Sequence, residues 1–322
     1  MGRKQVCWNA DGLAFGVRGQ EDAVRRIHLL PNLLTLANTF CGLLALTKGI
    51  DALAFAGAEG ATFYSKIATA CWLVFLGMAF DAVDGKVARM VGGSSSFGAQ
   101  LDSFSDMITF GLAPAFLVKV LIEHEGPIHG YSVNPRVHFI AAAVFSVMAI
   151  LRLARFNLET EPDAASHAHF RGLPSPAAAG AVCATMLMYL SLRNPALEWS
   201  DGTQTPLGAI LHWFPQIDQS PFLFWFLPVF AAMLPLLGLL MVSRIRYVHM
   251  FSAITGRGQF VSLVGVVFSA VCLFVAPVLA VFVVFNSYVI LGVFRALLGR
   301  RGGGTRPPAA VPQREFHDAS AG

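Results

Sequence analysis

The chain has 322 residues, of which 55% are hydrophobic and only 13% are charged, and its formal net charge is +4. Because a soluble globular protein carries about 25% charged residues, this composition argues against a soluble domain and predicts a polytopic membrane protein. The positive charge does not indicate a nucleic-acid partner. The basic residues flank apolar segments, where such residues set the orientation of membrane spans.

Apolar segments long enough to cross a bilayer follow one another along the chain. A spanning helix needs about 20 apolar residues, and the segments that meet this length are 30–49, 66–91, 98–122, 137–156, 174–192 and 221–243. The apolar region 260–297 is long enough for two short helices, and "APV" at 276–278 offers a turn between them, because Pro disfavours helix at the preceding residue. The sequence therefore predicts an all-α polytopic membrane protein with about eight transmembrane helices.

The remaining segments divide the chain around these spans. Residues 1–28 are expected to be a cytoplasmic N-terminal segment, and the stretch 21–36 is able to begin as a helix in the membrane interface. The rest of the predicted division is 29–192 for the transmembrane core, 193–220 for an outer loop, 221–298 for C-terminal transmembrane helices and 299–322 for a Gly-, Pro- and Ala-rich disordered tail.

The distribution of basic residues gives an orientation. With eight spans and both termini in the cytoplasm, 18 of the 23 Lys and Arg residues lie on the cytoplasmic side and five on the outer side. This asymmetry follows the positive-inside rule. If 260–297 were a single span, the basic tail would lie outside, which fits the rule less well.

Four aspartates interrupt the apolar pattern where the second and third spans meet. Asp81 and Asp84 are three residues apart near the end of one predicted helix, and Asp102 and Asp106 are four apart near the start of the next. Residues at these spacings share one face of a helix. The "GGSSS" at 92–96 predicts a tight turn, so the hairpin is expected to bring four carboxylates together at the cytoplasmic face.

Four unpaired carboxylates at membrane depth would be costly, at roughly 2.5–3.5 kcal/mol for each intramembrane charge. One or two divalent cations would offset much of this cost, and hard oxygen ligands suit Mg²⁺, Mn²⁺ or Ca²⁺. Polar residues reaching out of a helix end, paired with Lys86 and Arg89, are the simpler alternative, but matched stripes on two helices disfavour it. A cation transporter is a remote alternative, since its path would place polar residues at several depths.

The aspartates form part of a longer spaced pattern, D-x-x-D-G-x-x-A-R, eight residues, then G-x-x-x-D-x-x-x-D. The residues at its fixed positions are Asp81, Asp84, Gly85, Ala88, Arg89, Gly98, Asp102 and Asp106. This pattern closely resembles the signature of the CDP-alcohol phosphatidyltransferases. The resemblance implies a six-helix core of that family followed by C-terminal helices.

Enzymes of this family displace CMP from a CDP-linked lipid with the hydroxyl of an alcohol. The resemblance implies that Asp81, Asp84 and Asp102 hold a divalent metal, Mg²⁺ or Mn²⁺. It implies that Asp106 completes this site and acts as the general base on the alcohol. The positions implied to line the cytidine diphosphate are Asp81, Gly85, Ala88, Arg89 and Gly98. The bilayer is the implied environment, and a homodimer is the implied assembly.

Other stretches resemble a branch of the family, the bacterial and archaeal phosphatidylserine synthases. These stretches are 30–46, 101–116, 151–158 and 170–180, within a resemblance that covers roughly 28–190. The implied reaction joins CDP-diacylglycerol and L-serine to give phosphatidylserine and CMP, in the inner membrane of a bacterial cell. A sibling transferase acting on glycerol phosphate, inositol phosphate or choline stays open, because the aspartates do not exclude it.

A serine acceptor requires a cation for its carboxylate. Arg152, Arg155 and Asn157 lie at the cytoplasmic end of the fourth span, and Arg171 follows in the next connection. Arginine suits bidentate recognition of a carboxylate or phosphate, so we expect these residues to help bind serine or the diphosphate. The alternative is that the arginines anchor the helix end at lipid phosphates.

Overall fold

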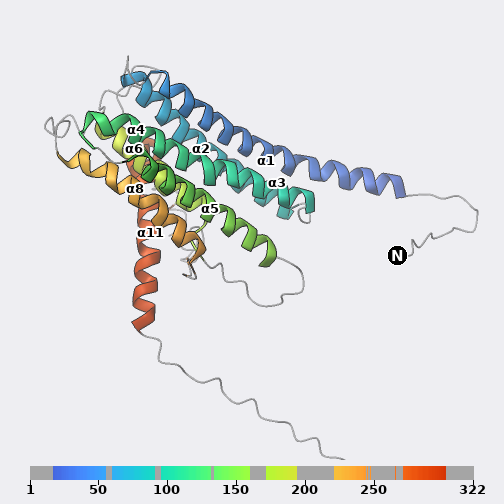
Figure 1. The fold of residues 1–322 in the computed structure, drawn as a ribbon. Helices are drawn as coiled ribbons and strands as arrows, with labels where there is room; N and C mark the ends of the chain where they lie inside the picture. The colour runs from blue at the N-terminus through green and yellow to red at the C-terminus, as the bar shows by residue number, and fades with distance from the viewer. Residues whose placement is uncertain are drawn as a thin grey trace, which may run out of the picture.

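The computed structural model of the protein is all-helical (Figure 1). It describes residues 17–55, 60–90, 96–131, 134–159, 172–193, 221–243, 245, 247, 265 and 271–301. The helices are α1 (Val17–Leu53), α2 (Gly60–Met90), α3 (Ser96–Asp106), the π-helix η1 (Met107–Leu112), α4 (Ala113–Ile128), α5 (Pro135–Glu159), α6 (Ser175–Arg193), α8 (Pro221–Val242) and α11 (Pro277–Arg301).

Seven helical stretches within the described ranges are long and apolar enough to cross a membrane. They are Leu29–Leu53, Thr62–Met90, Phe97–Ile128, Pro135–Asn157, Ser175–Arg193, Phe224–Val242 and Pro277–Leu298. The prediction of an all-α polytopic protein is confirmed, and the first six predicted spans each coincide with one of these helices. In the last apolar region the helix is interrupted at Ala276, within the predicted "APV" turn. The helix expected after this turn coincides with Pro277–Leu298, whereas most of the helix expected before it lies outside the described residues.

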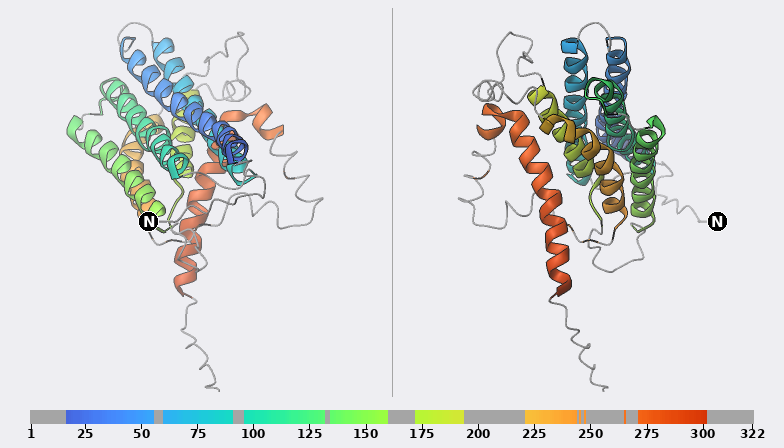
Figure 2. Two further views of the ribbon diagram at one scale, coloured as in Figure 1. Left: turned by 90° about the vertical axis from the view of Figure 1, so that its right-hand side faces the viewer. Right: turned by 60° about the vertical axis from the view of Figure 1, so that its left-hand side comes forward.

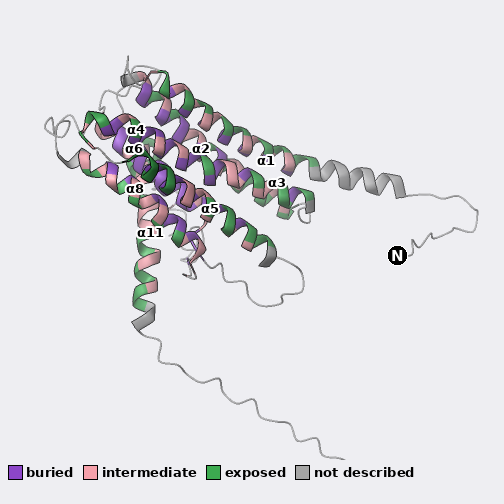
Figure 3. Ribbon diagram, viewed as in Figure 1, coloured by how far each residue is buried: buried purple, intermediate pink, exposed green. Residues whose placement is uncertain are grey.

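The helices pack as one bundle from which α11 projects. Helix α1 packs along α2, α5 packs on α8, and α11 packs on α6 before its C-terminal part extends beyond the bundle (Figure 2). Buried residues line the inward faces of the helices, and exposed ones follow the outer faces (Figure 3). Large apolar side chains such as Phe40 and Phe139 are exposed on these outer faces, as expected of a surface that contacts lipid.

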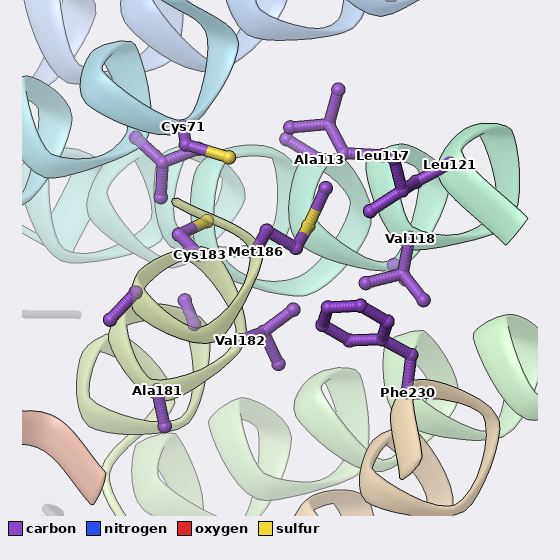
Figure 4. Packing of buried hydrophobic residues seen from close by; sticks show 14 of the residues in the cluster. Cys71, Ala113, Leu117, Val118, Leu121, Ala181, Val182, Cys183, Met186 and Phe230 are labelled. Carbon is purple, nitrogen blue, oxygen red and sulfur yellow. The ribbon is translucent and has the colours of Figure 1, made fainter. Parts of the chain in front are cut away.

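Helix α6 is the most deeply buried of the candidate spans, and its N-terminal half consists of small residues. Its run from Ala177 to Ala181 is buried throughout, and a Cβ at Gly180 would collide with the ring of Phe285 on α11. Small residues allow close helix approach, on which packing inside a membrane depends. Around α6 the core is filled by side chains from α2, α4 and α8, including Cys71, Leu117 and Phe230 (Figure 4).

The third span contains a π-helix directly after Asp106, so that α3, η1 and α4 form one interrupted helix. Such π segments occur mostly as single turns, often at functional sites. Thr109 of η1 is buried against α1 and α2, where a Cβ on Gly77 would lie only 2.7 Å from Thr109 Cγ2. A glycine at this position therefore lets α2 approach η1 closely.

A second polar cluster closes the other end of the third span. Glu125 of α4 is fully buried, and its carboxylate accepts hydrogen bonds from the hydroxyls of Tyr64 and Tyr189. It also accepts one from Arg193 Nε at 3.3 Å, and His129 Nε2 lies 3.1 Å from Glu125 Oε2. The carboxylate thus ties α2, α4 and α6 together at the end of the bundle away from the four aspartates.

Candidate active site

Three of the four aspartates converge between α2 and α3. A carboxylate oxygen from each of Asp81, Asp102 and Asp106 lies within 4.8 Å of the others. Asp81 comes from α2, whereas Asp102 and Asp106 are one turn apart on α3. Asp81 lies in the C-terminal third of α2, α3 is the next helix along the chain, and each of the two helices packs on α1. The helical spacing read from the sequence therefore does place these side chains on facing stripes.

Asp84 lies beside this trio rather than within it. Its side chain is 5% exposed, and its Oδ2 accepts a hydrogen bond from Thr35 Oγ1 of α1 at 3.0 Å. It interacts electrostatically with Asp81 and Asp102. Asp84 is thus oriented by Thr35 of α1 and adds its negative charge to that of the three converging carboxylates.

The donor set fits a divalent cation. All converging atoms are carboxylate oxygens, the ligands preferred by Mg²⁺ and Mn²⁺. Asp102 Oδ1 is buried and has no hydrogen-bond partner within the described part of the chain. An unsatisfied buried carboxylate oxygen is costly, and a bound cation would satisfy it.

Gly85 is exposed next to the aspartates on α2. Glycine inside a helix costs about 1 kcal/mol relative to alanine, so its presence needs a reason. Packing does not supply one: apart from its chain neighbours and its own helix backbone, no atom of the described residues lies within 4 Å of the place where its Cβ would be. This open space permits a ligand to lie against the helix backbone. Arg89, one turn on, is exposed and donates from Nε to the Gly85 carbonyl at 2.9 Å.

The other two motif positions lie on either side of the same turn. Ala88 is half-buried on α2, and Gly98 is buried on α3. Of the predicted turn at 92–96, residues 92–95 lie outside the described residues, and Ser96 begins α3.

Sequence reasoning missed two polar residues of α1 that contact the aspartates. Thr35 binds Asp84, and the buried Asn38 has its Nδ2 3.5 Å from Asp106 Oδ1. Two hydroxyls bind the α1 backbone in return: Ser105 Oγ donates to the Thr35 carbonyl at 3.1 Å, and Thr109 Oγ1 to that of Asn38 at 3.0 Å. Their signal was present as an i, i+3 polar pair in an apolar span.

The four residues expected to bind serine or phosphate are placed differently from one another. Arg152 donates from Nη1 to Ser175 Oγ at 2.6 Å and interacts electrostatically with Asp106. Asn157 is exposed and donates from Nδ2 to Ser103 Oγ of α3 at 3.0 Å. Arg155 is half-buried on the same helix, and Arg171 lies outside the described residues. The described structure thus links Arg152 to Asp106.

The fold and the cluster together define a class of protein: a multi-pass integral membrane protein whose helices gather carboxylates, fit for a divalent cation, at one end of the bundle. The profile of the CDP-alcohol phosphatidyltransferases matches residues 28–217, more than half of the chain. The chain therefore belongs to the CDP-alcohol phosphatidyltransferase family, whose members are phospholipid-synthesising transferases.

Individual relatives are also similar to this chain, one of them over more residues than the profile. The CDP-diacylglycerol–serine O-phosphatidyltransferase of Helicobacter pylori is 29% identical over 277 residues, which cover 85% of this chain and 93% of the relative. The protein of the same name from Bacillus subtilis is 30% identical over 171 residues, covering 53% of this chain and 80% of the relative. The archaetidylserine synthase of Methanothermobacter thermautotrophicus is 33% identical over 153 residues, covering 47% and 54%.

Proposed function

We propose that this protein transfers the phosphatidyl group of CDP-diacylglycerol to the hydroxyl of L-serine, giving phosphatidylserine and CMP. The observation that carries this proposal is the convergence of Asp81, Asp102 and Asp106 within a family signature. The choice of serine is supported by the names of relatives that match most of the chain. A sibling reaction with another alcohol is the alternative that the experiment below distinguishes.

The proposed roles follow from the positions of the side chains. Asp81, Asp84, Asp102 and Asp106 would hold the cation, Mg²⁺ or Mn²⁺, which when bound would neutralise diphosphate charge and improve CMP as a leaving group. The open backbone at Gly85 would receive the cytidine diphosphate, flanked by the remaining motif residues Ala88, Arg89 and Gly98.

Asp106 is proposed to act as the general base. An alcohol is a weak nucleophile at neutral pH, so a positioned carboxylate must accept its proton as the bond to phosphorus forms. The serine oxygen would attack the phosphorus that carries diacylglycerol, and the bond from that phosphorus to the CMP oxygen would break. Asn38, from α1, is within reach to hold the Asp106 carboxylate in one orientation.

We further propose that the site faces the cytoplasm of a bacterial cell and that the protein acts as a homodimer. The positive-inside asymmetry supports this orientation. Reporter fusions at 194–220 and at the C-terminus test it. Activity of a periplasmic reporter at the C-terminus would contradict it, and light scattering of the protein in detergent tests the dimer.

The acceptor is tested with purified protein in detergent, CDP-diacylglycerol and Mn²⁺ or Mg²⁺. We expect CMP release that depends on L-serine, with labelled serine recovered in lipid, and loss of this release when EDTA is present. Parallel reactions contain glycerol phosphate, inositol phosphate or choline in place of serine. Release with one of these alcohols and none with serine would overturn the serine assignment while leaving the family chemistry intact.

A further inference from the structure

The surroundings of Arg152 point to a bound anion. Its guanidinium donates to Ser175, the first residue of α6 and itself fully buried. The N-terminus of a helix carries a partial positive charge, which disfavours a nearby cation and favours an anion. Asp106 supplies one negative charge near Arg152, but the proposed mechanism gives that carboxylate to the cation and the acceptor proton. Arg152 and the helix end are therefore arranged for a further anionic group.

The C-terminal part of the chain fixes this region. The backbone N–H of Gly172 donates to the Ile245 carbonyl at 2.8 Å, and that of Leu173 donates to the Leu240 carbonyl at 3.0 Å. Gly172 has φ +95°, and a Cβ there would collide with the Met241 carbonyl oxygen, so the contact requires glycine. The end of α8 thus holds the connection that leads into Ser175.

Helix α11 contributes a polar side chain near Arg152. Tyr288 of α11 interacts electrostatically with Arg152. Its ring packs against that of Tyr247, with centroids 5.6 Å apart, and Tyr247 in turn covers Gly292, where a Cβ would overlap its ring. The packing of Tyr247 against Tyr288 and Gly292 fixes the position of the Tyr288 ring.

Tyr247 carries an unexplained polar group. The residue is 8% exposed, and its hydroxyl is buried with no hydrogen-bond partner among the described residues. Buried tyrosine hydroxyls normally have a partner. This unpartnered hydroxyl belongs to the tyrosine that packs against Tyr288, and a ligand or its hydration would supply the missing partner.

We infer that Arg152, Ser175 and Tyr288 form the acceptor pocket beside Asp106, that this pocket takes the carboxylate of an amino-acid alcohol, and that Tyr247 holds Tyr288 in place. The inference rests on the proposed function and deepens it. Tyr247 and Tyr288 lie outside the region 28–217 matched by the family profile. The part of the chain beyond that region therefore contributes acceptor specificity, whereas the aspartates within it provide the chemistry common to the family.

The first test compares Tyr288→Phe with the wild type in the CMP-release assay. A hydrogen bond to a charged group is worth enough for a change of about 10- to 100-fold. We expect KM for L-serine to rise by about tenfold or more, with kcat and KM for CDP-diacylglycerol within about twofold of wild type. Tyr131→Phe is the matched control, because Tyr131 lies at the far end of the bundle against His138, and it should leave all three constants unchanged.

The second test identifies the recognised group. The ratio of kcat/KM for L-serine to that for L-serinamide, which lacks the carboxylate, should be large in the wild type and should fall in Arg152→Gln. If Tyr288→Phe or Arg152→Gln instead raises KM for CDP-diacylglycerol, the anion is the diphosphate and the inference is wrong. An unchanged serine KM in Tyr288→Phe would also overturn it.

A binding measurement separates this inference from the proposed function. L-serine should raise the thermal unfolding temperature of the wild type in detergent with CDP and Mn²⁺, and the shift should be lost in Tyr288→Phe. Serine binding through Tyr288 without serine turnover would retain the pocket and refute the proposed reaction. Serine turnover with an unaltered Tyr288→Phe would retain the reaction and refute the pocket, and absence of both binding and turnover would refute both.

Discussion

The hydrogen bond from Thr35 to Asp84 is predicted to set the affinity of the site for its cation. Thr35→Val keeps the shape of the side chain but removes the hydroxyl that lies 3.0 Å from Asp84 Oδ2. Asp84 is 5% exposed, so water replaces the lost donor poorly. A hydrogen bond to a charged group contributes about 1.5–3 kcal/mol, and every 1.4 kcal/mol is tenfold in a binding constant.

We therefore expect Thr35→Val to raise the Mn²⁺ concentration that gives half-maximal CMP release by about 10- to 100-fold, with less change in the rate at saturating Mn²⁺. Thr35→Ser keeps the hydroxyl and should restore most of the affinity. Thr47→Val is the matched control on the same helix, since Thr47 is exposed and donates to the Leu43 carbonyl. The reasoning is refuted if Thr35→Val unfolds at a lower temperature yet responds to Mn²⁺ as the wild type does.

Three other substitutions test separate parts of the molecule. Asp106→Asn should lower the rate of CMP release by about 10²–10⁴-fold, the usual contribution of a general base, in a protein with unchanged gel-filtration behaviour; retained turnover would refute the base assignment. Gly85→Val should raise KM for CDP-diacylglycerol without lowering the unfolding temperature, because the space beside it is open, and a fall in stability at unchanged KM would contradict this. Glu125→Leu leaves Arg193 and two tyrosine hydroxyls without their acceptor, so we expect a loss of about 3 kcal/mol in stability. Both KM values should stay unchanged at low temperature, and an altered KM would show that this cluster also influences the site.

Hydropathy was enough to predict the spans because a bilayer demands long apolar helices, and those of α5 and α6 were located within a few residues. The aspartates were predictable because helical spacing fixes which side chains share a face. The tertiary partners of these residues were not predictable from the sequence. The residues around Thr35 and Asn38 in the sequence do not indicate that α1 packs against both α2 and α3, which carry the two halves of the motif. Tyr288 is likewise separated from Arg152 by more than a hundred residues, and it interacts with Arg152 because α11 packs beside α6.

The π-helix after Asp106 has a consequence for how this family member is able to vary in length. An α-helix advances by about 100° for each residue, so a residue added within Met107–Leu112 and continued as regular α-helix would turn α3 against α4 by that angle. Asp102 and Asp106 would then face away from Asp81, or Glu125 would leave its tyrosines. We therefore expect a single-residue insertion in this stretch to disrupt one of the two clusters, whereas a substitution of one of its apolar side chains by another leaves the register of α3 and α4 unchanged.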